Sequence, residues 1–210
     1  MRRLDTPELL DEAHAPHDDM ARSLRDLRRF NAWAGGGRVY RKLVRRLLGE
    51  RREALVIDLG AGTADLVDSL GMRAIAVDIN LRHLLYERER SRTRRVVGDA
   101  KRLPFRDDAA DAVTSSHFFH HFTPEENADV IAESLRVAKV GIAFTDTRRH
   151  RLPLLFTQLL AIFRLVGRIT RFDAPASVRR GYTTDEVRAI APGATVDNYV
   201  PFRWGLLQWK

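Results

Sequence analysis

Short apolar runs, three of which end in an aspartate, are the feature that most constrains the fold of this 210-residue chain. Five runs of strand length cover residues 54–59, 74–78, 95–99, 109–115 and 140–145. Segments with helical spacing of apolar residues, such as 64–70 and 128–137, separate most of them. Apolar strands joined by helices predict a mostly parallel sheet that is covered by helices on both faces. The sequence therefore predicts an α/β fold.

The segment before the first strand is predicted to be helical. Asp18 precedes one helix, and residues 39–48 form a second helix with a clear apolar side. The glycines at positions 35–37 are expected to separate the two.

The segment after the fifth strand has a third pattern. We expect a long helix over residues 152–170, a short helix over residues 184–190, and a closing antiparallel pair of strands at the C-terminal end. The predicted division is a helical cap, an α/β domain and a helical insertion within that domain, over residues 1–52, 53–210 and about 148–182.

The composition excludes several kinds of site. The chain has no cysteine, which excludes disulfides, thiolate-bound metals and a cysteine nucleophile. No apolar stretch follows Arg2 and Arg3, so no signal peptide is predicted and we expect a cytoplasmic protein. The net charge is +8, and residues 148–180 hold eight arginines against Asp173 alone. This local excess makes nucleic acid and an anionic membrane surface candidate partners.

A glycine loop follows the first predicted strand. Gly60 permits a tight turn from strand to helix, and Gly62 lets a ligand approach the backbone closely. Asp78 lies 20 residues after Asp58, where an acid can accept hydrogen bonds from ribose hydroxyls. Asp99 ends the third strand, where it can accept from an adenine amino group. Ligands bind beyond the carboxyl ends of parallel strands, so these residues predict a ligand that contains a nucleoside.

Two cofactors are compatible with such a loop, a nicotinamide dinucleotide and S-adenosylmethionine. A pyrophosphate needs a helix start that is free of negative charge. Asp65 stands at that place, where it repels a pyrophosphate but suits a ligand with an ammonium and a sulfonium group. The residues therefore favour S-adenosylmethionine.

Four blocks of sequence in the order 56–63, 77–80, 98–105 and 111–122 resemble those of the class I S-adenosylmethionine-dependent methyltransferases, particularly the ubiquinone and menaquinone biosynthesis group. The resemblance implies a Rossmann-like fold with S-adenosylmethionine as cofactor. By the same resemblance, the loop is expected to hold the methionine part of the cofactor, Asp78 its ribose, and Asp99 with Ala100 its adenine. The implied cofactor-binding residues are Asp58, Gly60, Ala61, Gly62, Asp78, Ile79, Asp99, Ala100 and Ser116. Ala64 stands where many members have glycine, and we expect its methyl group to be tolerated.

Histidines follow the fourth predicted strand, which the resemblance directs towards the methyl acceptor. An imidazole there can deprotonate a phenol or position the acceptor. We predict that His117 and His120 are catalytic; packing at a helix start is the alternative for His120 and His121. No metal site is predicted, because no acidic ligand is spaced beside these histidines.

The expected acceptor is a small, largely apolar metabolite of phenolic, quinone-like or polyketide type. Tyr40, near the glycine run, and Arg180 and Tyr182, after the insertion, are predicted to contact it. The helix expected over residues 152–171 is amphipathic, with arginines on one stripe. It is too short and too charged to span a bilayer, so it either caps the acceptor pocket or contacts a membrane surface peripherally.

Two other functions remain open at this point. One is an RNA methyltransferase that uses the basic segment 148–180, although the absence of an appended RNA module disfavours nucleic acid as a partner. The other is a non-enzymatic protein that binds S-adenosylmethionine. The sequence does not determine the oligomeric state.

Overall fold

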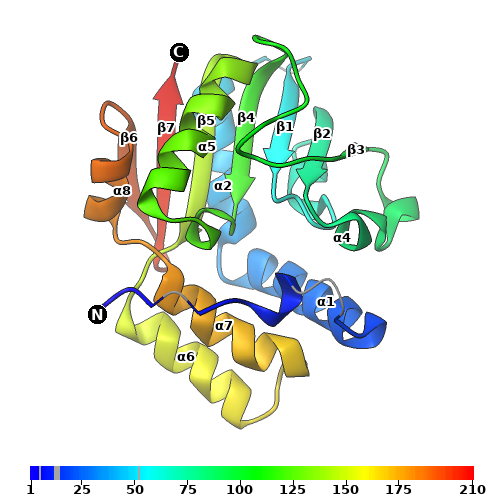
Figure 1. The fold of residues 1–210 in the computed structure, drawn as a ribbon, viewed down its shortest axis with the longest axis vertical. Coiled ribbons are helices and arrows are strands. Elements are labelled where there is room, and N and C mark those ends of the chain that lie inside the picture. Colours follow the sequence, from blue (N-terminus) through cyan, green and yellow to red (C-terminus); the bar gives the residue numbers. More distant parts are fainter. Residues whose placement is uncertain (5, 12–14, 52) are drawn as a thin grey trace.

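A seven-stranded sheet in the order β3-β2-β1-β4-β5-β7-β6 forms the centre of the computed structural model, which describes residues 1–4, 6–11, 15–51 and 53–210 (Figure 1). The strands are β1 (Leu55–Leu59), β2 (Arg73–Asp78), β3 (Arg94–Val97), β4 (Ala110–Ser116), β5 (Ala138–Thr147), β6 (Thr195–Tyr199) and β7 (Arg203–Trp209). Neighbouring strands from β3 through β2, β1 and β4 to β5 are parallel, whereas β7 is antiparallel to both β5 and β6. The predicted mostly parallel sheet with a C-terminal antiparallel strand is confirmed.

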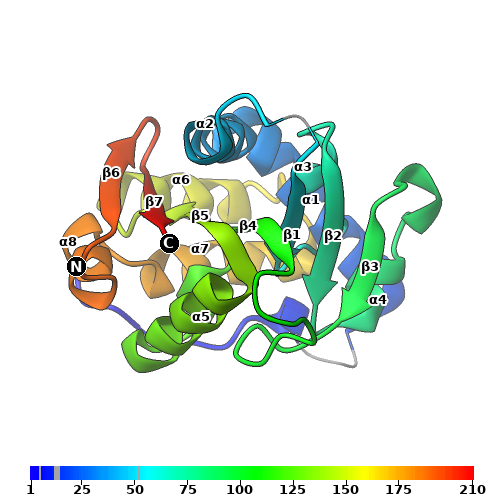
Figure 2. The same cartoon turned by 90° about the horizontal axis from the view of Figure 1, so that it is seen from above.

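Helices cover both faces of this sheet, as Figure 2 shows from above. They are α1 (His17–Trp33), α2 (Gly36–Leu48), α3 (Asp65–Asp68), α4 (Leu81–Leu85), α5 (Pro124–Val137), α6 (Arg151–Ile162), α7 (Arg168–Arg180) and α8 (Thr184–Ile190), with short 3₁₀ turns at Leu9–Asp11, Arg88–Arg90 and Phe119–His121. Thr123 and Thr183 open α5 and α8 with capping boxes, each completed by a glutamate three residues later. α2 and α3 lie on one face, and α5 and α8 lie on the other.

Alternation along the strands builds one apolar cluster on each face. In β1, Ile57 and Leu59 belong to the cluster that includes residues of α5 and α8, whereas Val56 belongs to the cluster with α2. α2 is therefore part of the core of the sheet and not of a separate cap. The predicted boundary at residue 52, which itself lies outside the described residues, does not divide the packing.

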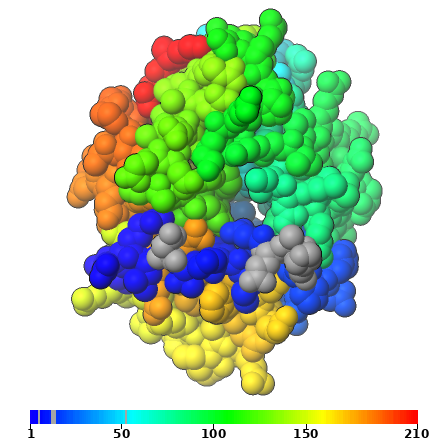
Figure 3. Space-filling model, in the orientation of Figure 1, coloured from blue at the N-terminus to red at the C-terminus, as the bar shows by residue number. Residues whose placement is uncertain are grey.

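A cover lies over the carboxyl ends of the strands. It is made of the N-terminal segment, α1, α6 and α7, which come from distant parts of the chain. A third apolar cluster joins Leu10, Met20 and Leu24 from the N-terminal region to Ile169 of α7. Figure 3 shows the N-terminal segment as a band across the molecule, between the sheet and the α6–α7 pair. The ends of β1, β2 and β4 point towards this cover in Figure 1.

The long helix predicted over residues 152–170 is wrong, because this segment folds as a hairpin of two helices, α6 and α7. The chain leaves the helical region at Arg164, which has a left-handed φ of 53°. The buried carboxylate of Asp26 then accepts a hydrogen bond of 2.8 Å from the amide of Gly167, the residue that precedes α7. The reversal lets Val166 and Ile169 become buried. A tertiary contact with α1 therefore overrides a continuous helical pattern.

The helices that the structure describes include none that is both long enough and apolar enough to cross a membrane.

Candidate active site

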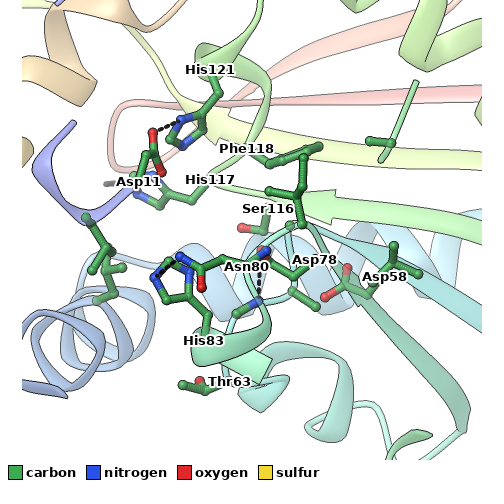
Figure 4. Close-up of a pocket in the computed structure, with 18 of the residues that line it drawn as sticks. Asp11, Asp58, Thr63, Asp78, Asn80, His83, Ser116, His117, Phe118 and His121 are labelled. Atoms are coloured by element: carbon green, nitrogen blue, oxygen red, sulfur yellow. Dashed lines mark hydrogen bonds and ion pairs between the residues drawn. The ribbon is translucent and has the colours of Figure 1, made fainter. Parts of the chain in front are cut away.

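A cavity of about 420 Å³ lies between the carboxyl ends of the strands and the cover. Its loop end is lined by residues 60–63, 78–80 and 98–101, and its histidine end by Glu8, Leu10, Leu24, residues 116–118 and residues 120–122. In Figure 4, Asp58 and Asp78 lie at one side of this cavity, and His117 and His121 at the other. Every residue predicted from the sequence to bind the cofactor lines this cavity, as do His117 and His120.

The glycine loop brings the backbone to the cavity. Gly60 and Gly62 have left-handed φ angles of 60° and 51°. A β-carbon on Gly60 would lie 2.2 Å from the ring of Phe118, whereas one on Gly62 would meet no described atom within 4 Å. Gly60 therefore allows close packing of the loop against residues 116–122, which we call the histidine segment, and Gly62 leaves open space for a ligand. Ala64 has a φ of 65° and accommodates its methyl group in the core.

Asp78 is fixed by the backbone around it. One carboxylate oxygen accepts a hydrogen bond of 2.9 Å from the amide of Gly62, and the other accepts one of 2.8 Å from the amide of Asn80. Each oxygen keeps a second lone pair that can accept a hydroxyl hydrogen. Asp99, at the next strand end, accepts a bond of 2.9 Å from the amide of Lys101. Both carboxylates are thus held at the cavity in fixed positions.

Asp58 is a buried carboxylate without a cationic partner among the described residues. Its side chain accepts hydrogen bonds from the hydroxyls of Tyr40 and Thr114 at 2.8 and 2.7 Å. Burial raises the pKa of Asp58 to about 7; the two hydroxyl donors oppose this shift, and the charges of Asp65 and Asp68 add to it. A bound cation would relieve this cost, so the site fits a ligand with an ammonium group.

The three predicted substrate contacts lie behind the cavity wall instead of lining the cavity, so this prediction is corrected. Tyr40 is only 1% exposed, and its hydroxyl donates to the carboxylate of Asp58. The hydroxyl of Tyr182 donates to the carbonyl of Phe122 at 2.6 Å, and Arg180 donates to the carbonyl of His121 at 2.9 Å. These side chains fix the histidine segment. The residue types suggested contact with the acceptor. The direction of each side chain depends on tertiary packing, which the sequence pattern does not show.

His120 is held between two carboxylates. Its Nδ1 lies 2.7 Å from Asp146, at the end of β5, and its Nε2 lies 3.0 Å from Glu8 in the N-terminal segment. Burial alone would lower the pKa of His120, but the two negative charges raise it to about 10. Burial alone would likewise raise the pKa of Glu8, which the charge of His120 lowers to about 2. The Glu8–His120–Asp146 group is therefore ionised throughout the neutral range.

His117 is in the opposite protonation state. Its backbone has a left-handed φ of 59°, its Nε2 lies 3.2 Å from the hydroxyl of Thr147, and its Nδ1 lies 3.6 Å from Asp146. Burial and the nearby charge of Arg203 hold its pKa well below the usual range. His117 is therefore a neutral imidazole at the cavity, and its two ring nitrogens, one a donor and one an acceptor, lie beside Thr147 and Asp146.

The acids beside these histidines were missed in the sequence, where no acid is spaced near them. Two groups, Glu8 with His120 and His121, and His117 with His120 and Asp146, bring ligand atoms within 4.8 Å of one another. Glu8 also accepts a hydrogen bond of 2.7 Å from Ser177. A proton on His120 satisfies both carboxylates, so we interpret the group as an ion pair that fixes the cover. Asp146 had a detectable signal, because it directly follows the fifth predicted strand, over residues 140–145.

Comparisons with known proteins agree with this geometry. Residues 57–144 match the profile of a family described as a methyltransferase domain. The chain is 29% identical over 185 residues to a demethylmenaquinone methyltransferase of Mycolicibacterium paratuberculosis, covering 84% of this chain and 78% of that protein. It is 30% identical over 162 residues to that of Corynebacterium glutamicum, covering 74% and 69%. It spans 52% and 60% of two further demethylmenaquinone methyltransferases.

The fold has a counterpart among solved structures. A methyltransferase from Aquifex aeolicus, described as dependent on S-adenosylmethionine, superposes with a TM-score of 0.62 at 17% identity, over 89% of this chain and 97% of that one. The parallel sheet with its loop-edge cavity is that of a Rossmann-like enzyme binding a nucleoside cofactor. The chain belongs to the class I S-adenosylmethionine-dependent methyltransferases. The predicted enzyme class and cofactor are confirmed, and the non-enzymatic alternative is set aside.

The residues at the loop end fit this cofactor. Asp58 is a buried carboxylate whose ionised form would match an ammonium group, Asp78 offers acceptor positions for ribose hydroxyls, and Gly62 leaves space beside the backbone. Asp99 and Ala100 are the residues that would face the adenine. We propose these individual roles on the basis of chemistry and position.

Removing the carboxylate of Asp78 should weaken cofactor binding strongly. In Asp78→Ala we expect at least about a hundredfold loss of affinity for S-adenosylmethionine, because hydrogen bonds to a charged acceptor contribute about 1.5–3 kcal/mol each. Titration calorimetry measures the affinity, and circular dichroism checks that the fold is kept. Asp129→Ala, at an exposed carboxylate of α5 that does not line the cavity, is the control. Unchanged affinity in Asp78→Ala would refute the assignment.

Cofactor binding should depend on pH through Asp58. The carboxylate is ionised above a pKa of about 7 and neutral below it, so affinity for a cationic ligand should fall as pH falls through 7. Between about pH 7.5 and pH 5.5 we expect the affinity to fall about tenfold. Asp58→Asn should bind more weakly and show no such slope. A native profile that is flat, or that rises towards acid, contradicts this role.

Proposed function

We propose that the protein methylates a small, largely apolar acceptor with a phenolic or quinone-like ring, bound at the histidine end of the cavity. The observation that carries this proposal is that one cavity joins the glycine loop to a wall of apolar and imidazole side chains. Leu10, Leu24, Leu27, Phe118 and Phe122 line that wall. The demethylmenaquinone methyltransferases among the relatives support an acceptor of this class.

The chain contributes mainly alignment and the exclusion of water. The cofactor supplies a methyl group that is already activated on a sulfonium, so little acid or base chemistry is needed at the donor. Several contacts close the cover. The carboxylate of Asp173 accepts from the amides of Leu9 and Leu10 at 2.8 and 2.9 Å, and Glu8 pairs with His120. Holding two reactants together in a dry site is a large part of catalysis for such a transfer.

His117 is the residue that we propose to accept a proton from the acceptor, which requires its unprotonated ring nitrogen to exchange its present partner for the acceptor hydroxyl. A phenol or hydroquinone becomes a stronger nucleophile, at oxygen and at ring carbon, when it loses its proton. The neutral ring of His117 lines the cavity and is oriented by Thr147 and Asp146. His120, whose two ring nitrogens already face Asp146 and Glu8, acts as a positioning residue for the cover.

The RNA alternative has less support from the contacts of the basic segment. Arg149 is buried and donates to the carbonyls of Met1 and Gly181, and it also pairs with Glu186. Arg180 is buried as well and donates to the carbonyl of His121. Part of the basic segment thus stabilises the fold and is not available to a nucleic acid.

A comparison of acceptors tests the proposal. The protein is incubated with S-adenosylmethionine and either apolar hydroquinones, charged catechols or bulk RNA, and the products are analysed by mass spectrometry. We expect a gain of one methyl group on the apolar hydroquinones and little turnover of the charged compounds. Turnover of RNA alone, or of the charged compounds in preference, would refute the proposed acceptor class.

A substitution that keeps the backbone of His117 but removes its basicity separates catalysis from folding. Asparagine tolerates the left-handed conformation, so His117→Asn should fold normally. We expect kcat to fall at least about a hundredfold, the usual scale for a lost general base. The affinity for S-adenosylmethionine should change less than about threefold, since a general base acts on the transition state. His150→Asn, at a histidine that does not line the cavity, is the control. An unchanged rate would assign His117 to packing.

A further inference from the structure

The outer helix of the hairpin, α6, turns its apolar side chains towards solvent. None of its residues, all of which the structure describes, is buried. The exposed side chains follow helical spacing into the turn before α7: Leu152, Leu155, Phe156, Leu159, Ile162 and Phe163, with exposed fractions between 42% and 70%. A stripe with this spacing normally faces a core. In Figures 1 and 3, α6 lies on the side of α7 that is remote from the sheet.

Positive charge frames this apolar stripe. The sequence has no aspartate or glutamate from residue 147 to residue 172. Arg151 and Arg164 are exposed at the two ends of α6, and Arg168 is exposed at the start of α7, where it also contacts Asp19. Exposed apolar side chains between arginines are the pattern of a helix that lies in the interface of a membrane.

We propose that α6 and the turn that follows it dock on an anionic lipid surface. The apolar stripe would enter the boundary between headgroups and acyl chains, and Arg151 and Arg164 would contact lipid phosphates. Charge favours this occupant over a second copy of the chain, because two copies facing each other through α6 would oppose arginines without any acid in the segment. No described helix can cross a bilayer, so the contact is interfacial.

The hairpin also connects this surface to the cavity. α7 packs against α6, and it carries Asp173 and Ser177, which bind the N-terminal segment of the cover. Docking through α6 would therefore place the cover on the side of the molecule near the lipid. An apolar acceptor dissolved in that lipid would benefit, although the docking surface itself does not depend on which acceptor is used.

Sedimentation with lipid vesicles tests the docking surface. The full chain is mixed with vesicles of phosphatidylcholine alone, or of phosphatidylcholine with phosphatidylglycerol, at low and high salt. We expect binding to the anionic vesicles that weakens as salt is raised. Ile162→Glu/Phe163→Glu should weaken it at least about tenfold. Arg151→Gln/Arg164→Gln should weaken it about fivefold for each arginine and reduce the salt dependence.

A matched control places the same charge on an exposed apolar residue elsewhere. Leu85→Glu, at a side chain of α4 that is 51% exposed, should bind anionic vesicles as the native chain does. Circular dichroism and the melting temperature check that each variant folds. Loss of vesicle binding in Ile162→Glu/Phe163→Glu with an unchanged melting temperature supports the proposal.

Three results would overturn it. The first is no vesicle binding, or binding that neither set of hairpin substitutions changes. The second is a native protein that forms a dimer and does not bind vesicles, when the Ile162→Glu/Phe163→Glu substitutions dissociate that dimer. The third is binding to RNA that only the arginine substitutions weaken, again without vesicle binding. Vesicle binding by a protein that fails to methylate any apolar hydroquinone would refute the proposed acceptor and leave the docking surface standing.

Discussion

Four carboxylates lie at the same end of one sheet, and each is stabilised by hydrogen bonds or by an opposite charge. Asp78 receives two backbone amides, Asp99 receives one, Asp58 receives two hydroxyls, and Asp146 faces the charged ring of His120. Parallel strands force this convergence, because all their carboxyl ends lie at one edge. Asp58 and Asp146 are buried, and a buried negative charge needs a donor or a cation. The glycine loop, the hydroxyl of Tyr40 and the histidine segment are arranged around that need.

The cover depends on the same electrostatics. Glu8 comes from the start of the chain, and its position is set by His120 and Ser177, which belong to the cavity wall and to α7. The carboxylate of Glu8 stays ionised well below neutral pH, and the ring of His120 stays protonated well above it. The attachment between them therefore persists across the physiological range. Protonation of Asp58 at the loop end therefore leaves the attachment between Glu8 and His120 in place.

Patterns that are local in the sequence predicted the fold well. The strand runs ending at Asp58, Asp78 and Asp99 are short, apolar and separated by helices, so their parallel arrangement followed from period and length. The same logic gathered all of the predicted cofactor-binding residues at one cavity. Asp146 obeys this rule too, and its omission from the predicted site came from looking for acids only beside the histidines.

The features that were not predicted from the sequence depend on contacts between residues that are distant along the chain. The break between α6 and α7 follows from the bond between Gly167 and Asp26, which are 141 positions apart. The burial of Tyr182 follows from its bond to Phe122, 60 positions away. Helical spacing at residues 152–170 is compatible with one helix or two, and only tertiary packing chooses between them.

The left-handed backbone at His117 implies a trade-off between stability and activity. A non-glycine residue in that conformation costs about 1–2 kcal/mol, and here the amide of His117 is tied to the carbonyl of Thr145 at the end of β5. Glycine would relieve this cost and would remove the imidazole. A search for more stable variants of this enzyme would therefore be drawn to position 117, and under the role that we propose for His117 such variants would lose turnover.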